Sequence, residues 1–273
     1  MTTSESTDCC ELTVCTLASG SRGNAVYISD GRTGLLVDAG LSGVEIERRL
    51  AARNLCPKNI DAILVSHEHT DHIKGVGVLS RKYSLPVYMT PKTARAVGSK
   101  LGRIDEVRHF EPGVRFRVDR LTIHPFSLSH DAADPAGFTI GRNGTSIGLA
   151  TDLGVATALV KAHLRACTLL ILEANHDPDL LMHGPYPWHL KQRVKGRTGH
   201  LSNSQSRELL QEVIHEGMRH VILGHLSQQN NTPDHALREV ALALNGHKTR
   251  ISVALQDTCG ELIRVQTPAE KAP

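Results

Sequence analysis

The chain has 273 residues, of which 40% are hydrophobic and 22% are charged, a composition typical of globular proteins. No apolar run approaches the roughly 18 residues that predict a membrane span, so we expect no membrane partner. The N-terminus is polar and lacks the apolar stretch of a signal peptide, which favours a cytoplasmic protein. A formal net charge of +3 is too small to be a strong signal of nucleic-acid binding.

Turn residues and hydrophobic periodicity divide the chain into strands and helices. The first predicted helix offers Val44, Ile46 and Leu50 for burial. Because strands come in clusters and helices occur singly, the pattern predicts an α+β fold with two helix-covered sheets rather than one doubly wound parallel sheet. We expect one domain at 12–265, between flexible tails at 1–11 and 266–273. In chain order the predicted elements are strands 12–18, 25–29 and 34–37, a helix from the Ser42-x-x-Glu45 capping box to about 53, strand 60–65, helix 71–83, strands 121–128, 138–140 and 146–150, helix 155–163, strand 169–172, helix 203–216, strand 221–223 and helix 233–244.

Histidine and cysteine are the side chains most suited to metal or redox chemistry. The chain holds sixteen histidines, the residue most used for metal binding and for proton transfer near neutral pH. Its cysteines show no paired metal-ligand spacing and no Cys-x-x-Cys motif, so we expect free thiols, several of them buried. A metal or redox role for adjacent Cys9 and Cys10 is the alternative. The six cysteines are Cys9, Cys10, Cys15, Cys56, Cys167 and Cys259.

The strongest chemical signal is the run from His67 to His72, HEHTDH, directly after the apolar strand 60–65. Residues two apart in extended backbone point the same way, so His67 and His69 can reach one cation. Asp71 and His72 follow where the chain turns into a helix, which directs them toward a second position. The run therefore predicts two adjacent metal sites, and the alternative is an exposed polar turn.

Further metal-binding side chains follow other predicted strands, at His130, Asp152 and His225. Each of them alone is as readily an ordinary loop residue. Together they complete two cations with nitrogen and carboxylate ligands, a set that suits Zn²⁺, Mn²⁺ or Fe. An aspartate between two metals can bridge them. Asp38, also at a strand end, is better placed as an acceptor that orients a ligand imidazole.

The order and spacing of these residues resemble the five ordered motifs of the metallo-β-lactamase fold, from Leu12 to about Val265. The resemblance implies an αββα sandwich with the metals at the shared edge of two sheets. An aspartate rather than a thiol at position 152 is typical of the hydrolase and phosphodiesterase branches. The implied ligands are His67, His69, His130 and Asp152 for one metal, and Asp71, His72, Asp152 and His225 for the other.

Finer motifs resemble the YycJ/WalJ-like group of this fold, whose members are described as 5′-to-3′ DNA exonucleases. The resemblance implies a nucleic-acid phosphodiesterase, with DNA as the first choice of substrate. The interval between Asp152 and His225 is too short for the clamp domain of the RNA-degrading and interstrand-repair members, which leaves DNA versus RNA open. The matching segments are Leu17 to Asn24 (LASGSRGN), His67 to Gly77, Glu173 to Asp177 (EANHD), Tyr186 to Trp188 (YPW) and Gly199 to Asn203 (GHLSN).

Glu173 and His200 resemble the paired glutamate and histidine that serve the leaving oxygen in tRNA-processing ribonucleases of this fold. His200 would donate the proton while Glu173 holds its ring, and Asp71 would orient or deprotonate the attacking water. The alternative is that Glu173 caps a strand and His200 only packs.

Contacts to a phosphodiester backbone are expected from the turn near residue 20, from the motif near residue 202 and from a basic stripe without acids at 189–200. A solvated charged surface is the alternative for the stripe. Trp188 either stacks on a terminal base or fills the core. The candidate substrate-binding residues are Ser19, Ser21, Asn24, Lys191, Arg193, Lys195, Arg197, Ser202 and Asn203.

Two other functions fit the same metal ligands. A thioester or lactone hydrolase of the glyoxalase II type would be expected to carry a C-terminal substrate-binding helical region, which the short segment after about Val265 does not offer. A non-catalytic metal-binding scaffold would tolerate the loss of ligands, and none is lost. We therefore expect a dinuclear-metal phosphodiesterase in which two divalent ions activate water for attack on phosphorus.

Overall fold

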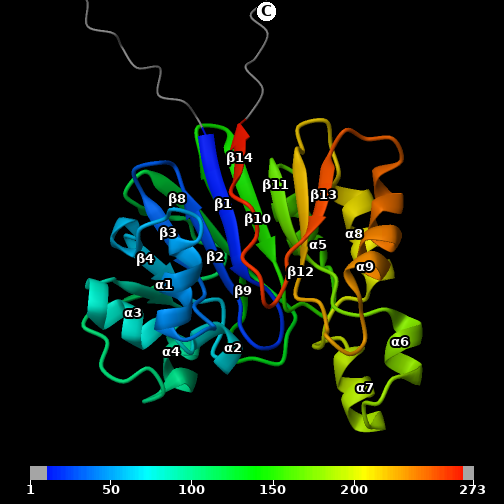
Figure 1. The fold of residues 1–273 in the computed structure, drawn as a ribbon, viewed down its shortest axis with the longest axis horizontal. Helices are drawn as coiled ribbons and strands as arrows, with labels where there is room; N and C mark the ends of the chain where they lie inside the picture. Colours follow the sequence, from blue (N-terminus) through cyan, green and yellow to red (C-terminus); the bar gives the residue numbers. More distant parts are fainter. Residues whose placement is uncertain (1–10, 267–273) are drawn as a thin grey trace, which may run out of the picture.

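Two seven-stranded β-sheets pack face to face in the computed structural model, which describes residues 11–266 (Figure 1). Each sheet is antiparallel in one half and parallel in the other. The first sheet has the order β14 (Ile263–Gln266), β1 (Glu11–Ala18), β2 (Ala25–Ser29), β3 (Gly34–Val37), β4 (Ala62–Leu64), β5 (Val87–Met89) and β6 (Val107–His109). The second has the order β13 (Arg250–Val253), β12 (His220–Gly224), β11 (Leu169–Glu173), β10 (Thr145–Ala150), β9 (Ala136–Arg142), β8 (Leu121–Ser127) and β7 (Phe116–Val118).

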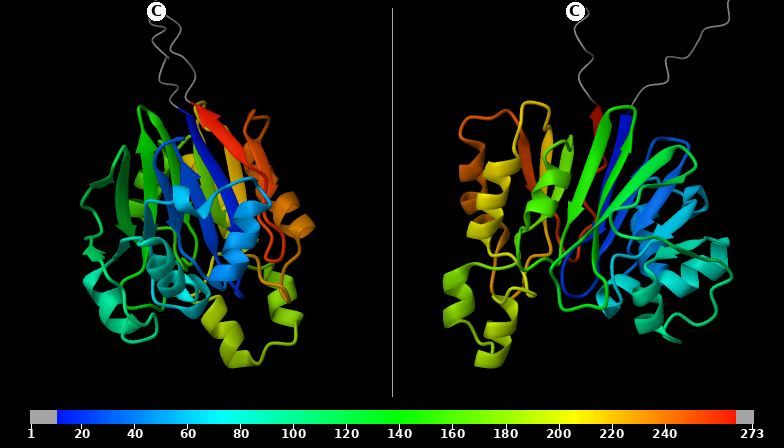
Figure 2. Two further views of the ribbon diagram at one scale, coloured as in Figure 1. Left: turned by 60° about the vertical axis from the view of Figure 1, so that its left-hand side comes forward. Right: turned by 180° about the vertical axis from the view of Figure 1, so that it is seen from behind.

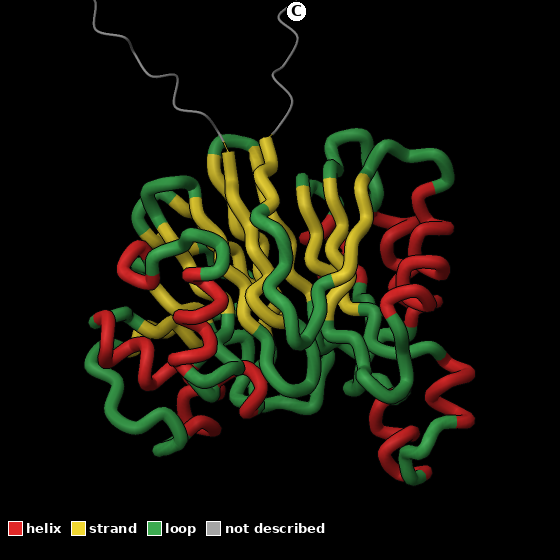
Figure 3. Tube along the Cα trace, in the orientation of Figure 1, coloured by secondary structure: helices red, strands yellow, loops and turns green. Residues whose placement is uncertain are grey.

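Helices cover both outer faces, which gives four layers in the order helix, sheet, sheet, helix (Figure 2). The first sheet is covered by α1 (Gly43–Ala51), α3 (Val76–Tyr83) and α4 (Pro91–Val97), and the second by α5 (Ala158–Leu164), α8 (Asn203–Val213) and α9 (Pro233–Ala241). The short helix α2 (Thr70–Ile73) lies at one end of the sandwich under the first sheet, and α6 (Pro178–His183) and α7 (Trp188–Val194) project from the same end under the second sheet (Figure 1 and Figure 3). Two 3₁₀ turns, Pro57–Asn59 and Leu242–Leu244, complete the elements.

Strand β1 shows why the strands of this fold appear in the sequence as nearly continuous apolar runs. Its residues alternate between two buried faces: Leu12 and Val14 join the cluster between the sheets, whereas Cys15 and Leu17 join the cluster under the helices. A strand buried on both faces has no polar side to expose. The predicted α+β class and αββα sandwich are therefore confirmed.

The predicted helix at 71–83 is wrong in one respect, because α2 and α3 are separate helices. Gly75 lies between them, and its N–H donates to Ala39 O at 2.7 Å. A Cβ at this glycine would lie 2.4 Å from Leu41 O. The close approach of the loop at Ala39–Leu41 therefore interrupts the helix.

The first helix also differs from the prediction. Ile46 and Leu50 are fully buried, but Val44 is 75% exposed, so its expected burial is wrong. Ser42 accepts from the Glu45 N–H, while the Glu45 carboxylate pairs with Arg48 and Arg49 instead of closing the capping box.

Both ends of the predicted domain extend by one residue, since Glu11 pairs with Gln266 across β1 and β14. The rest of the predicted tails, 1–10 and 267–273, lies outside the described residues. Within residues 11–266, no helix is long and apolar enough to cross a membrane. Strand β1 begins and β14 ends at the end of the sandwich opposite α2, so the loops around α2 lie far from both (Figure 1).

Candidate active site

Three histidines from the two sheets meet at the end of the sandwich that carries α2. His67 and His69 follow β4, with His69 in extended backbone, and His67 Nε2 lies 3.0 Å from His69 Nδ1. His130 follows β8, and its Nε2 lies 3.4 Å from His69 Nδ1. Ligand atoms of the three residues lie within 4.8 Å of one another, so they can hold one metal ion.

A second group forms beside the first. Helix α2 begins after His69 and carries Asp71 and His72, and the His72 ring lies beside that of His67, with 4.1 Å between the ring centroids. His225 follows β12 and completes the group: His72 Nε2 and His225 Nε2 lie 3.5 Å and 3.9 Å from Asp71 Oδ2. These three residues also offer ligand atoms within 4.8 Å of one another.

Asp152 lies between the two groups. Its Oδ2 is 3.3 Å from His72 Nε2, and its Oδ1 is 3.8 Å from His130 Nε2. The side chain is only 4% exposed, so it faces the histidines rather than solvent. The structure thus brings together all seven residues that the sequence predicted as metal ligands.

Three residues around these groups share an unusual backbone. Asp38, Asp152 and His225 have φ angles of 59°, 61° and 55°, in the left-handed region that residues other than glycine rarely adopt. They follow β3, β10 and β12, respectively. Such a conformation costs about 1–3 kcal/mol and persists mainly where function requires it. Five other non-glycine residues share this conformation elsewhere in the described part of the chain, but only at these three do the side chains meet at one edge of the sheets.

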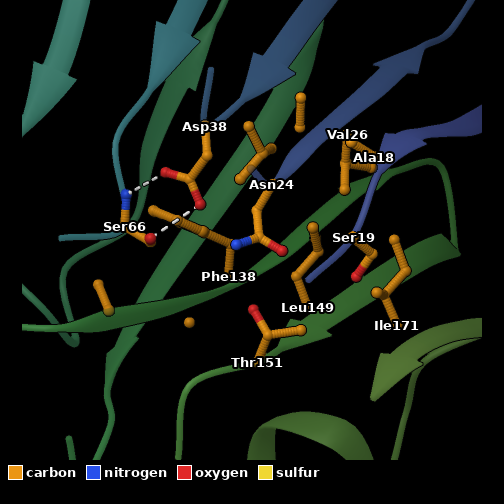
Figure 4. A pocket seen from close by; sticks show the side chains of 14 residues that line it. Ala18, Ser19, Asn24, Val26, Asp38, Ser66, Phe138, Leu149, Thr151 and Ile171 are labelled. Carbon is orange, nitrogen blue, oxygen red and sulfur yellow. Dashed lines mark hydrogen bonds between the residues drawn. The ribbon is translucent and has the colours of Figure 1, made fainter. Parts of the chain in front are cut away.

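A buried carboxylate fixes the histidine of the second group. Asp38 Oδ2 lies 2.8 Å from His72 Nδ1, the contact that an orienting acceptor makes. Ser66, which the sequence reasoning missed, donates its N–H and its hydroxyl to Asp38 at 2.8 Å each (Figure 4). Asp38 and Ser66 line a cavity of about 30 Å³ between the sheets, which is large enough for water.

Glu173, at the end of β11, holds two imidazoles. Its Oε1 lies 2.9 Å from His200 Nδ1 and 2.8 Å from His225 Nδ1. Three backbone N–H groups, of Asp152, Leu153 and Leu201, donate to the same carboxylate. Burial favours a neutral carboxyl, but His200 and His225 lower the pKa of Glu173 to about 2. Although Glu173 and His200 also lie within metal-binding distance of Asp152 and His225, these hydrogen bonds saturate Glu173 and favour an orienting role.

The donor set fits divalent cations. Carboxylates of Asp38, Asp71, Asp152 and Glu173 surround the histidines, so negative charge is concentrated here. Asp152 Oδ2 and His225 Nε2 are buried and have no hydrogen-bond partner among the described residues. A buried polar atom without a partner indicates that water or an ion completes its environment.

The pKa shifts agree with cation binding. Burial lowers the pKa of His67 and of His130, which favours the neutral form that binds a metal. Burial also opposes charge on His225, yet Asp152, Asp71 and Glu173 together raise its pKa to about 10. The negative potential that attracts a proton to His225 attracts a metal ion for the same reason.

The turn at 19–24 supports the metal groups instead of offering a phosphate cradle. Ser19 Oγ accepts from the His225 N–H at 2.7 Å, and Asn24 Nδ2 lies 3.0 Å from His72 Nε2. Both side chains are buried, so their predicted contact with substrate is corrected to a bracing contact. Only the Ser21 N–H of this turn lacks an acceptor among the described residues. Ser21 is exposed and stays a candidate.

The predicted basic stripe divides between two faces of α7. Arg193 lines a cavity beside the metal groups, and its Nε lies 2.6 Å from Asp131 Oδ2. Lys191 instead donates to Met182 O in α6, and Lys195 Nζ lies 5.1 Å from the centre of the Trp188 ring. Both lysines contact Met182 of α6, since Lys195 Nζ also lies 3.9 Å from Met182 Sδ, and neither lines the cavity that Arg193 faces. Their predicted place in a continuous substrate stripe is corrected for this reason.

Of three other residues that the sequence predicted to contact substrate, Ser202 and Asn203 are buried and Arg197 is exposed. Ser202 caps α8 in a complete capping box with Gln205, and Asn203 is fully buried in a pair of hydrogen bonds with Asn231. Their predicted contact with substrate is therefore corrected to a structural role. Arg197 is exposed and stays a candidate.

A cavity of about 140 Å³ opens beside the second metal group. His200 and His225 lie at one side, Ser21 at another, and Tyr186 and Arg193 come from the projection that includes α7. An aromatic ring, a guanidinium and a histidine therefore share one small space. Trp188 is 60% exposed and does not fill the core, which removes that alternative.

Sequence reasoning missed several residues that complete the site. Gln256 braces the turn at 19–24, since its Oε1 accepts from the Arg22 N–H at 2.7 Å and its Nε2 donates to Gly23 O at 3.0 Å. Asp131 holds Arg193 next to His130. No local pattern marks Ser66, Asp131 or Gln256, although Asp131 directly follows a predicted ligand and could have been considered for that reason.

Comparison with known proteins agrees with this geometry. The chain matches the β-lactamase superfamily domain over residues 33–226. Exodeoxyribonuclease YycJ of Bacillus anthracis is 38% identical over 230 residues, which cover 84% of this chain and 87% of YycJ. Exodeoxyribonuclease WalJ of Streptococcus pneumoniae is 40% identical over 219 residues, which cover 79% of this chain and 81% of WalJ.

Among solved structures, the metallo-β-lactamase fold protein YhfI of Bacillus subtilis is similar with a TM-score of 0.73. The similarity covers 94% of this chain and 100% of YhfI at 18% sequence identity, so it bears on the fold alone. The chain therefore belongs to the metallo-β-lactamase superfamily, together with its relatives YycJ and WalJ.

Proposed function

We propose that this protein is a dinuclear-metal phosphodiesterase that degrades DNA as a 5′-to-3′ exonuclease. The observation that carries the proposal is the His200–Glu173 pair, held at 2.9 Å beside two adjacent groups of metal-binding residues. Relatives that are 38% and 40% identical to this chain over 230 and 219 residues are named exodeoxyribonucleases, which supports the same reaction class.

Two divalent ions would occupy the two groups described above. One ion would be held by His67, His69 and His130, and the other by Asp71, His72 and His225. Asp152 would contribute to the binding of both ions. Mixed imidazole and carboxylate ligands suit Zn²⁺ or Mn²⁺, with Fe as the next choice. When bound, the ions supply a nucleophilic water at neutral pH and neutralise the non-bridging phosphate oxygens.

The protein's own residues would then position the reactants and move protons. Asp71, whose side chain is 24% exposed, orients the attacking water. Glu173 accepts from His200 Nδ1, which leaves Nε2 of that ring to donate a proton to the leaving oxygen. Asp38 and Glu173 keep the rings of His72 and His225 fixed.

The cavity beside the second group would receive the end of the nucleic-acid chain. Arg193 and Ser21 can contact phosphate there, and Tyr186 can stack on a terminal base. Arg197, exposed nearby in sequence, would add to the cationic surface. The cytoplasmic location expected from the sequence stays a prediction.

A substrate panel tests the proposal. Single- and double-stranded DNA with a 5′-phosphate, RNA of the same sequence and S-lactoylglutathione are each assayed with Zn²⁺ and with Mn²⁺. We expect 5′-labelled DNA to release mononucleotides from the labelled end first, with cleavage falling as salt rises. Efficient turnover of S-lactoylglutathione with intact oligonucleotides would replace the proposal by a thioester hydrolase. Metal binding without turnover of any substrate would favour a non-catalytic scaffold.

A further inference from the structure

Two cysteines at opposite ends of the chain lie in contact. Cys15 Sγ in β1 and Cys259 Sγ, in the segment before β14, are 3.5 Å apart. The segment is held beside β1 because the Gly260 N–H donates to Thr16 O at 2.8 Å. A disulfide needs a sulfur–sulfur distance of about 2.05 Å, so closure requires only a small movement.

The two thiols differ in exposure and in charge environment. Cys15 is fully buried, whereas Cys259 is partly exposed. Arg53 places its guanidinium at this segment, with Nε 2.7 Å from Gly260 O and Nη2 2.6 Å from Cys259 O. The adjacent thiol of Cys15 and then Arg53 lower the pKa of Cys259 to about 6 against the effect of burial. The hydrogen bond with Cys259 raises the pKa of Cys15.

This asymmetry divides the roles in a redox reaction. Cys259 is the more exposed thiol, and its lowered pKa favours the thiolate, the form of cysteine that attacks peroxides. Cys15, which is buried and in contact with it, is the neighbour that can resolve an oxidised Cys259. Cys167 offers a contrast within the same protein, because it is buried and burial raises its pKa to about 12.

We propose that Cys15 and Cys259 form an oxidation site that converts a hydroperoxide into a reversible disulfide. The Cys259 thiolate attacks the terminal peroxide oxygen, the O–O bond breaks, and the other oxygen leaves as an alcohol or water after taking a proton. The resulting sulfenic acid is attacked by Cys15 Sγ. The S–S bond forms as the S–O bond breaks, and the hydroxyl leaves as water with the Cys15 proton. Two thiols are oxidised and one hydroperoxide is reduced.

The disulfide would fasten a segment that braces the active site. Gln256, three residues before Cys259, bonds to Arg22 and Gly23 of the turn at 19–24. Asn24 of that turn contacts Asp71 and His72 in the second metal group. Oxidation therefore stabilises the contact between β1 and this segment, and we expect it to raise the melting temperature.

The test uses a Cys9→Ser/Cys10→Ser/Cys56→Ser variant, which leaves Cys15, Cys167 and Cys259. Hydrogen peroxide is added in slight excess, and the product is examined by intact mass, by peptide mapping without reductant and by thermal denaturation. We expect the loss of two hydrogen atoms, a cross-linked peptide pair containing Cys15 and Cys259, and a higher Tm that dithiothreitol reverses. The wild-type protein, mapped in parallel, should give the same cross-link.

Single substitutions separate the two roles. Cys15→Ser should leave a sulfenic acid on Cys259 that a dimedone probe traps, while Cys259→Ser should leave Cys15 reduced. Cys167→Ser, the matched buried control, should form the cross-link as the parent does. Peroxide-treated parent protein in which both thiols still react with iodoacetamide after denaturation would overturn the proposal. A cross-link that joins other cysteines, or over-oxidation of Cys259 without a disulfide, would also overturn it.

Discussion

Replacement of His200 by alanine tests the proposed proton donor directly. The ring lies 2.9 Å from Glu173 through its Nδ1, and neither of the two groups of predicted metal ligands includes it. After the substitution, Glu173 still accepts from His225 and from three backbone N–H groups. We therefore expect the His200→Ala protein to keep its fold and its metal.

The size of the effect follows from the role of the ring. Loss of a general acid lowers kcat by roughly 10²- to 10⁴-fold, or about 2.7–5.5 kcal/mol of transition-state stabilisation. This loss should appear with an oligonucleotide, whose alkoxide leaves poorly until it is protonated. Bis(p-nitrophenyl) phosphate has an activated leaving group and should be hydrolysed by the variant at nearly the normal rate. Steady-state kinetics on both substrates measures the contrast.

His189→Ala is the matched control, because His189 is an exposed histidine on α7. It should leave both reactions unchanged. Equal loss of kcat on both substrates in His200→Ala would refute proton donation and indicate that the ring binds phosphate or supports the site. No loss on either substrate would mean that His200 only packs.

Three other predictions address the metals, the cavity and the fold. Metal-replete protein should carry two divalent ions per chain by elemental analysis, and His67→Ala or Asp152→Ala should lose metal and activity together; a metal-free wild type would contradict the dinuclear site. Arg193→Ala should raise KM for DNA and reduce the salt dependence of binding by about one phosphate contact, whereas Lys191→Ala, which bonds α6, should not. Gly75→Ala places a Cβ 2.4 Å from Leu41 O and should lower stability by about 1–3 kcal/mol in thermal denaturation. Val44→Ala, at an exposed position, should change the free energy of unfolding by less than about 0.5 kcal/mol. Equal Tm values for the Gly75→Ala and Val44→Ala variants would contradict the argument that the loop approaches Gly75 closely.

Local geometry made much of the candidate site predictable. The spacing of the HEHTDH run predicts metal ligands because residues two apart in extended backbone point to the same side, as His67 and His69 were expected to do. The first turn of a helix then directs the side chains of Asp71 and His72 differently. Strand patterns likewise located His130, Asp152 and His225 at strand ends. The family resemblance, confirmed by the match to YycJ and WalJ, supplied the pairing of these residues.

The sequence by itself thus determined the layered fold and the seven residues that meet at the shared edge, but it did not locate strands β5, β6, β7, β13 and β14 or helices α4, α6 and α7. Only the tertiary structure decided which polar side chains face that edge and which brace it from behind. Ser19, Asn24 and Asn203 read as surface contacts in the sequence, yet they are buried against His225, His72 and Asn231. The reason is physical: periodicity reports which face of an element is apolar, whereas the partner of a buried polar atom depends on other segments that fold against it, here 28 to 206 residues away in the sequence.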